Sequence, residues 1–260
     1  MQFKDQLHTV FELKSKPKRI ISLVPSITEL LVDLGLQDAI VGVTKFCVHP
    51  KFLLQEKQIV GGTKTIKVDK IKALEPDFII CNKEENTKEI VIESKKITTT
   101  YVSDIYTVAD TLELINQFGK LFFCQEKARE IIHNILVKHT AFLTFLSDKK
   151  TKNVAYFIWK NPWMVAANNT FINHLLDTNK FKNVFIEKER YPEIDLEDLQ
   201  NIDDLDTIFL SSEPYPFKEK HILELQEKFT STKIILVDGE YFSWYGSRLL
   251  NAFDYFKSLH

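Results

Sequence analysis

The sequence predicts an α/β protein with two Rossmann-like lobes, each built on a parallel sheet, joined by one long backbone helix. First, short apolar runs alternate with helix-periodic segments in both halves of the chain. Second, this alternation stops over 107–147, where no strand-like run occurs. Third, 260 residues fit one large domain or two lobes, at roughly 100–200 residues per domain. Strands that alternate with helices pair in parallel and are covered by those helices.

The first half contains four predicted strands separated by helices. The first helix starts with Pro25, and Ser26 precedes Glu29 by three positions, which is the pattern of a capping box. Gly35 is expected to end this helix. The predicted strands are 19–24, 39–44, 77–81 and 98–102, and the predicted helices are 25–36, 68–76 and 84–96.

The segment 125–147 keeps a helical period, with apolar side chains near one face at Ile131, Ile135, Phe142 and Leu146. A helix of this length would span about 35 Å, which is the diameter of a small domain. We therefore expect an N-terminal lobe over 1–122, an inter-lobe helix over 123–148 and a C-terminal lobe over 149–260.

Alternation resumes in the second half, and a weak internal echo suggests that the two lobes are related. Two segments share one pattern: an acidic residue at the start of a short helix, then an Asp, then an apolar strand. They are VDKIKALEPDFII (68–80) and LEDLQNIDDLDTIFL (196–210). Chance similarity between two such units is the alternative. The predicted strands are 153–158, 206–210 and 233–237, and the predicted helices are 170–177, 217–229 and the stretch from Ser243.

Composition excludes several classes of protein. Lys plus Arg is 34 and Asp plus Glu is 36, a net charge of -2, which argues against a nucleic-acid protein because such proteins neutralise phosphates with clustered basic residues. The three cysteines, Cys47, Cys81 and Cys124, form no CxxC and are expected to be buried, reduced thiols. Motifs of the types GxGxxG, GxxxxGK[ST], GxSxG and HExxH are absent, so dehydrogenase and hydrolase functions have little support.

Targeting signals are also absent from the sequence as written. No segment approaches the roughly 18 apolar residues that a membrane span needs. The N-terminus carries Asp5, His8 and Glu12 and has no long apolar region, so it does not resemble a secretory signal. This predicts a cytoplasmic protein, or a periplasmic one if a signal before Met1 has been removed.

Two loops that follow strands of the first half carry candidate binding residues. TKFCVHP (44–50) offers Lys45, Phe46 and His49, and His49 could be a metal ligand, a proton donor or simply a satisfied histidine before a proline turn. NKEEN (82–86) offers Asn82, Glu84 and Glu85. The two glutamates could instead complement the dipole of the helix that follows.

Three loops of the second half add aromatic and acidic candidates: IWKNPWM (158–164), SSEPYPF (211–217) and DGEYFSWYGSR (238–248). IWKNPWM (158–164) has two tryptophans, which suit a flat ligand, although one of them is expected in the core. Arg248 could bind a carboxylate through its planar fork, or it could form a structural ion pair with Glu240. Because these loops follow strands on both sides of the long helix, a ligand cleft between the lobes is expected. The candidates here are Trp159, Glu213, Tyr215, Glu240, Tyr241, Trp244, Tyr245 and Arg248.

Longer segments resemble a known superfamily. Three segments of the first half resemble the N-terminal lobe of the helical-backbone metal receptors: PKRIISLVPSITELLVDLGLQDAIVGVT, the following VGG, and VDKIKALEPDFIICN. These receptors are periplasmic binding proteins of ABC importers for vitamin B12, iron-siderophores and haem. RYPEIDLEDL and EYFSWYGSR resemble its C-terminal lobe, so the likeness covers nearly the whole chain. The motifs TKFCVHP, NKEEN and SSEPYPF resemble a subgroup without an export signal.

The resemblance implies a substrate-binding protein that holds a corrinoid, haem or ferric chelate between its lobes without catalysis. It also allows a metal held by His49 with Glu84 or Glu240, and it implies that Asp69 and Glu197 dock onto a permease. Where cobalamin-binding members carry aromatic residues, this chain has Thr63 and Asn82. The alternatives are a cytosolic metal- or corrinoid-processing enzyme, or an interaction module that has lost its ligand.

Overall fold

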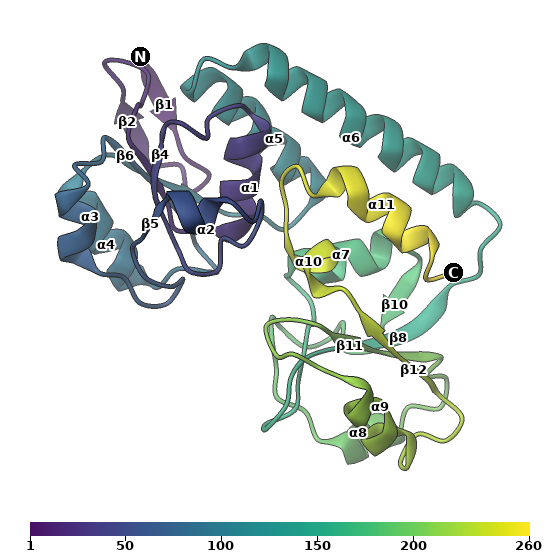
Figure 1. Cartoon of the computed structure of the whole chain (residues 1–260). Helices are drawn as coiled ribbons and strands as arrows, with labels where there is room; N and C mark the ends of the chain where they lie inside the picture. Colours follow the sequence, from purple (N-terminus) through teal and green to yellow (C-terminus); the bar gives the residue numbers. More distant parts are fainter. The chain divides into compact units, whose positions relative to one another are not determined.

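The computed structural model describes all residues 1–260 and divides the chain into two compact units (Figure 1). Unit 1 comprises Met1–Leu136 together with Trp244–Leu250, and unit 2 comprises Val137–Ser243 together with Asn251–His260. A short segment near the C-terminus therefore belongs to the unit that begins at the N-terminus. The predicted class of α/β protein with two lobes is confirmed.

Unit 1 contains a five-stranded, fully parallel sheet in the order β5-β4-β3-β6-β7. The central strand β3 is buried on both sides, as its continuous apolar run predicts. The four predicted strands are all present; β5 has only two residues and gives no periodic signal. The strands are β3 (Ile20–Ser22), β4 (Ile40–Val43), β5 (Gln58–Ile59), β6 (Phe78–Asn82) and β7 (Thr100–Ser103).

The three helices predicted in unit 1 are present, but the one predicted over 84–96 starts only at Lys88, α2 and α5 were not predicted, and one predicted cap is wrong. Pro25 is the first residue of α1 and Val24 is its N-cap, which makes no side-chain cap bond, so the capping box predicted at Ser26 is wrong. A proline at the first helical position moves Ser26 into the first turn, where it is buried. The helices are α1 (Pro25–Asp33), α2 (Leu53–Glu56), α3 (Val68–Ala73), α4 (Lys88–Ile97) and α5 (Val108–Leu121).

An antiparallel hairpin of β1 (Gln2–Lys4) and β2 (Val10–Glu12) precedes this sheet and was not predicted. Its strands have three residues each, too few to show a clear alternation. The ring of Phe11 packs against Phe78 and Tyr101 of the parallel sheet, at centroid distances of 6.0 and 6.3 Å.

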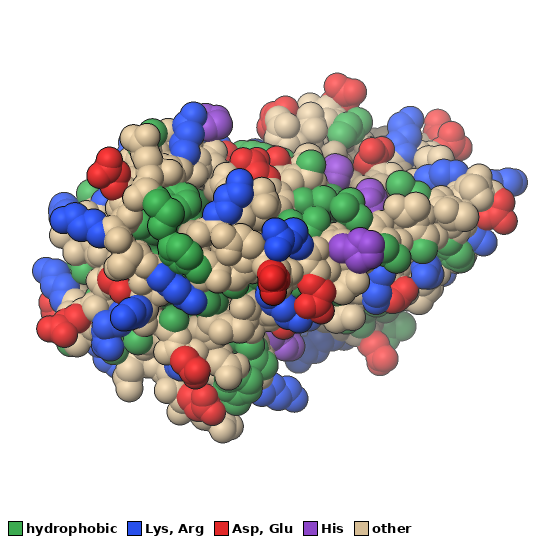
Figure 2. All heavy atoms as spheres, turned by 90° about the horizontal axis from the view of Figure 1, so that it is seen from above, with side chains coloured by type: hydrophobic (Ala, Val, Ile, Leu, Met, Phe, Trp, Pro, Cys, Tyr) green, Lys and Arg blue, Asp and Glu red, His purple; other side chains and the backbone are tan.

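The long helix α6 (Gln125–Phe145) has 21 residues and spans about 31 Å. Its apolar side chains Ile131, Ile135 and Phe142 are buried, as the predicted helical face requires. None of the helices combines the length and apolar character needed to cross a bilayer. Basic and acidic side chains are interspersed on the face that Figure 2 shows, in keeping with the small net charge.

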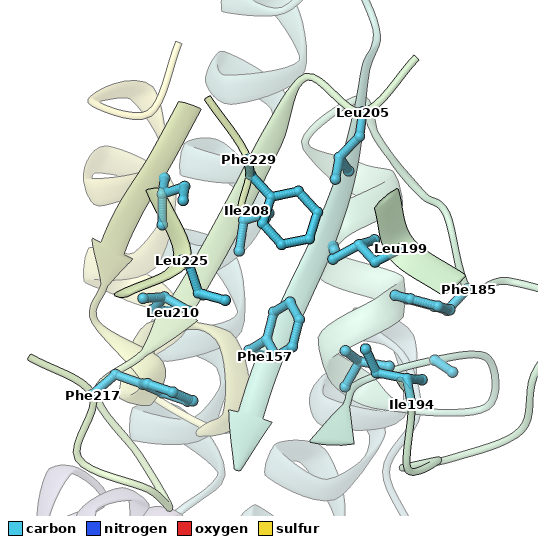
Figure 3. Packing of buried hydrophobic residues seen from close by; sticks show 14 residues of the cluster. Phe157, Phe185, Ile194, Leu199, Leu205, Ile208, Leu210, Phe217, Leu225 and Phe229 are labelled. Atoms are coloured by element: carbon cyan, nitrogen blue, oxygen red, sulfur yellow. The ribbon is translucent and has the colours of Figure 1, made fainter. Parts of the chain in front are cut away.

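Unit 2 contains a second parallel sheet in the order β10-β8-β11-β12, with β9 antiparallel to β8. Figure 3 shows side chains of β8 and β11, such as Phe157 and Ile208, meeting Leu199 of α8 and Leu225 of α9 in one core. The strands are β8 (Lys152–Trp159), β9 (Met164–Val165), β10 (Phe181–Asn183), β11 (Thr207–Ser211) and β12 (Lys233–Val237). The helices are α7 (Phe171–Thr178), α8 (Leu196–Gln200), α9 (Glu219–Gln226), α10 (Gly239–Ser243) and α11 (Leu249–Lys257).

The internal echo corresponds to equivalent structure in both units. In unit 1, α3 precedes β6, and in unit 2, α8 precedes β11. Asp69 and Glu197 lie in the first turns of the two helices and are exposed. All three cysteines are free thiols, of which Cys47 and Cys81 are buried and Cys124 is partly buried.

Candidate functional site

The loop 44–50 of unit 1 follows β4 and is tethered by Cys47, which lies in its middle. Its sulfur lies 3.2 Å from Thr28 Oγ1 and 3.3 Å from Thr44 Oγ1, and burial raises the pKa of the thiol. Cys47 therefore anchors the loop to α1 through Thr28. Its neighbour Phe46 is 47% exposed, and Lys45 Nζ lies 4.9 Å from the centre of the Phe46 ring.

Gly62 makes room for that aromatic side chain. A Cβ atom on Gly62 would lie 3.2 Å from the Phe46 ring, so the ring rests directly on the glycine backbone. The amide of Lys45 donates to the carbonyl of Gly61 at 2.8 Å, which joins the two loops. The VGG segment thus supports an exposed aromatic surface at the carboxyl end of β4.

The loop 82–86 is built around two buried asparagines. Asn82 is 2% exposed; its Oδ1 accepts from the amides of Glu84 and Glu85, and its Nδ2 donates to Ser103. Asn86 Nδ2 donates to the carbonyls of Leu23 and Thr63, which ties this loop to the glycine loop. Helix α4 starts at Lys88, after Thr87 as N-cap, so Glu84 and Glu85 lie outside its first turn and the helix-dipole alternative is wrong.

The segment Trp244–Leu250 packs into unit 1 beside α1. Gly246 has φ +97 and comes close to Leu30 and to the carbonyl of Ser26. Tyr245 is buried next to Ser26 and Ser103, and burial raises the pKa of Tyr245 well above its usual value. The Trp244 side chain meets His49 edge to face, with 5.4 Å between ring centres.

Arg248 pairs with Glu29 of α1, a partner that the sequence did not indicate. Nε and Nη2 of Arg248 each donate to a different oxygen of Glu29 at 2.8 Å, and the guanidinium lies 4.8 Å from the centre of the Trp244 ring. Burial raises the pKa of Glu29 despite the opposing effect of Arg248, and the nearby His49 also acts to lower it. The predicted capping-box glutamate therefore anchors the C-terminal segment instead.

In unit 2, aromatic side chains gather where β8 and β11 end. Trp159 is 39% exposed and meets Tyr215 at 5.6 Å between ring centres. Trp163 stacks on Phe217 within the core, which confirms that one of the two tryptophans is a core residue. The hydroxyl of Tyr215 lies 3.4 Å from Nε2 of His221.

A second feature of unit 2 is an open pocket of about 600 Å³. Ser243 Oγ donates to Glu213 Oε1 at 2.6 Å, and the amide of Glu240 donates to Asp238 Oδ1 at 3.0 Å. Tyr241 stacks on Tyr255 at 4.7 Å. Glu213 and Glu240 are predicted site residues and Ser212 lies in the SSEPYPF segment, whereas Leu236, Val237 and Tyr255 carry no sequence signal. The lining residues are Ser212, Glu213, Leu236, Val237, Asp238, Glu240 and Tyr255.

The predicted site residues thus divide between the two units. Unit 1 holds Lys45, Phe46, His49, Glu84 and Glu85, and each of their two loops is hydrogen-bonded to the glycine loop at 61–63. No group of three or more metal-ligating side chains is present in the structure. The predicted metal set takes Glu240 from unit 2, so it stays a prediction. Unit 2 holds Trp159, Glu213, Tyr215, Glu240 and Tyr241, whereas Trp244 and Arg248 belong to unit 1.

Comparison with known families identifies the chain, because the profile of a family described as periplasmic binding protein matches residues 20–234. This chain belongs to the periplasmic binding protein family. Periplasmic binding proteins of this kind are substrate-binding proteins rather than enzymes, so the predicted family and the predicted absence of catalysis are confirmed.

Relatives within the family support the same grouping. An uncharacterized ABC transporter substrate-binding lipoprotein of Bacillus subtilis is 25% identical over 179 residues, which are 66% of this chain and 56% of the lipoprotein. The chain thus spans a little over half the length of that relative. A vitamin B12-binding protein of Vibrio cholerae is 25% identical over 193 residues, which are 71% of this chain and 68% of that protein.

Solved structures confirm the fold. The periplasmic vitamin B12 binding protein of Vibrio cholerae superimposes with a TM-score of 0.81 at 20% identity, covering 93% of this chain and 96% of that one. A periplasmic heme binding protein of Pseudomonas aeruginosa gives a TM-score of 0.79 at 17% identity, covering 94% and 92%. This periplasmic binding protein therefore shares its architecture with receptors for more than one kind of ligand.

Proposed function

We propose that this periplasmic binding protein binds a metal-centred small molecule, namely a corrinoid, haem or ferric chelate, for an ABC importer. The observation that carries the proposal is that each unit exposes an aromatic side chain where its strands end: Phe46 in unit 1 and Trp159 in unit 2. Large flat ligands favour such apolar surfaces flanked by polar groups. Relatives named for vitamin B12 support the ligand class.

His49 is the candidate for direct contact with the metal of such a ligand. Imidazole nitrogen suits iron, cobalt and zinc, whereas carboxylates suit harder ions. His49 is partly buried and contacts Trp244, so the ring is ordered by its surroundings. Glu84 is the candidate carboxylate in the same unit, and Glu240 is the predicted ligand-facing acid of unit 2.

The proposal is tested by titrating the purified full chain with aquocobalamin, haemin and ferric citrate while recording visible spectra. We expect saturable, one-to-one binding of at least one probe, and loss of that binding in the H49A/E240A double variant. The H133A/E187A variant, which changes an exposed histidine and an exposed glutamate, is the matched control. Failure of all three probes to bind would contradict the ligand class, and unchanged affinity in H49A/E240A would contradict the site.

We further propose that Asp69 and Glu197 dock onto the permease of the importer. Both are exposed carboxylates in equivalent first turns of α3 and α8, and opposite charges at such positions guide association. In D69K/E197K we expect probe binding to stay unchanged while capture of the cognate permease in detergent is lost. Intact capture would refute the docking role. Delivery to an importer also requires the protein outside the cytoplasm, which cell fractionation tests.

A further inference from the structure

A chain of side-chain contacts leads from α1 through the C-terminal segment to the loop of His49. The two carboxylate oxygens of Glu29 accept hydrogen bonds from Nε and Nη2 of Arg248 at 2.8 Å. The Arg248 guanidinium lies 4.8 Å from the centre of the Trp244 ring, and the Trp244 and His49 rings are 5.4 Å apart. All four residues belong to unit 1, although the first and second are separated by 219 positions in sequence. Neither Glu29 nor Arg248 lies in the loop that they reach through these contacts.

We propose that Glu29, Arg248 and Trp244 are positioning residues that fix the His49 ring for contact with the ligand; this role rests on the proposed function. Trp244 is only 7% exposed, so its contribution is to pack rather than to offer surface. Its indole has Arg248 on one side and His49 on another. Displacing the guanidinium would therefore free the indole, and the histidine would lose its support.

The geometry requires arginine rather than any cation at position 248. Two nitrogen atoms of one planar group donate to the two oxygens of Glu29 while the carbon of the same group lies over an aromatic ring. A lysine ammonium is a point charge that can pair with the carboxylate but cannot hold both contacts in this way. R248K therefore keeps the charge and removes the positioning.

The first test uses the ligand-free protein and does not depend on the proposed function. In protein labelled at histidine, we expect nuclear Overhauser contacts between the His49 ring and the Trp244 indole, with the His49 signals assigned by their loss in H49Q. In R248K or E29Q these contacts should weaken while the signals of His139, which stacks on Phe253 of unit 2, stay unchanged. Absence of the contact in the wild-type protein, or its full retention in both variants, would overturn the proposal.

The second test asks whether Arg248 acts on the ligand through His49. Affinities for aquocobalamin and haemin are measured in the wild type, R248K, H49A and R248K/H49A, which form a double-mutant cycle. We expect R248K to weaken binding about tenfold in the wild-type background and to have no further effect in H49A. An equal loss in both backgrounds would show a merely structural role and overturn the proposal. If the wild type binds neither probe, the proposed ligand class fails, and the first test decides the positioning role alone.

Discussion

Replacing Arg248 by alanine should destabilise unit 1 through one identifiable contact. The side chains of Arg248 and Glu29 are only 10% and 19% exposed. Removing one partner of a buried ion pair costs about 3–5 kcal/mol, because the other charge stays buried without compensation. The lost contact with Trp244 adds about 0.5–2 kcal/mol. Because the pair keeps some access to water, we expect R248A to lose about 3 kcal/mol.

The same variant should show a characteristic pH dependence. Burial already raises the pKa of Glu29, and Arg248 opposes that rise, so the pKa climbs further in R248A. A carboxyl whose pKa is higher in the folded state favours folding at low pH, and this contribution is lost as the pH rises through the folded pKa. The deficit of R248A relative to wild type should therefore grow as the pH rises above the ordinary carboxyl pKa of about 4.3 and through the raised pKa of the folded state.

The free energy of unfolding of R248A at each pH is measured by urea unfolding in a W159F/W163F background. Tryptophan emission then reports on unit 1 alone, because Trp244 is the remaining tryptophan. K138A is the matched control: Lys138 pairs with Asp254 at the same 2.8 Å, but the two side chains are 38% and 55% exposed. We expect K138A to lose no more than about 0.5 kcal/mol. A loss in R248A as small as that of K138A, or one that does not vary with pH, would refute the reasoning.

Two further predictions concern other parts of the fold. N82A removes four side-chain hydrogen bonds in a buried loop and should cost about 2–4 kcal/mol in urea unfolding; a cost below that of an exposed N134A variant would contradict this. Burial lowers the pKa of His260 to about 4, so stability should fall by about 1 kcal/mol, discounted for partial exposure, as the pH drops from about 6.5 to 4. H260Q should remove that part of the pH dependence, and an unchanged profile would exclude His260 as its source.

The sequence predicts the sheets better than the site, for a physical reason. Buried strands such as β6 and β11 are continuous apolar runs, and their helices have a period of 3.6 residues, so both leave a local pattern. β1, β5 and β10 have two or three residues and leave none. The candidate loops follow from strand ends, but whether a side chain is exposed depends on what packs over it, as the buried Asn82 and the exposed Phe46 illustrate.

The pairing of Glu29 with Arg248 is the clearest example of a contact that could not be predicted from the sequence. Ser26 and Glu29 match a capping box, and that local explanation is complete in itself, so nothing directs attention to an arginine 219 positions away. The structure replaces it because the helix starts at Pro25, two residues earlier than a Ser26 cap would require. A local motif can therefore be present in full while its residues serve a long-range contact.

Whether a residue serves packing or is exposed at the site determines how mutations in the candidate site must be interpreted. Trp244 is nearly inaccessible and Arg248 is held by Glu29. Loss of ligand binding after substitution of Trp244 or Arg248 is therefore explained by altered packing alone and does not require a direct contact with the ligand. Lys45 and Phe46 are exposed, and their removal leaves the Cys47 anchor of the loop intact. His49 contacts the packed segment and also lies on the exposed loop, so it is the residue through which a change in the framework would reach the ligand.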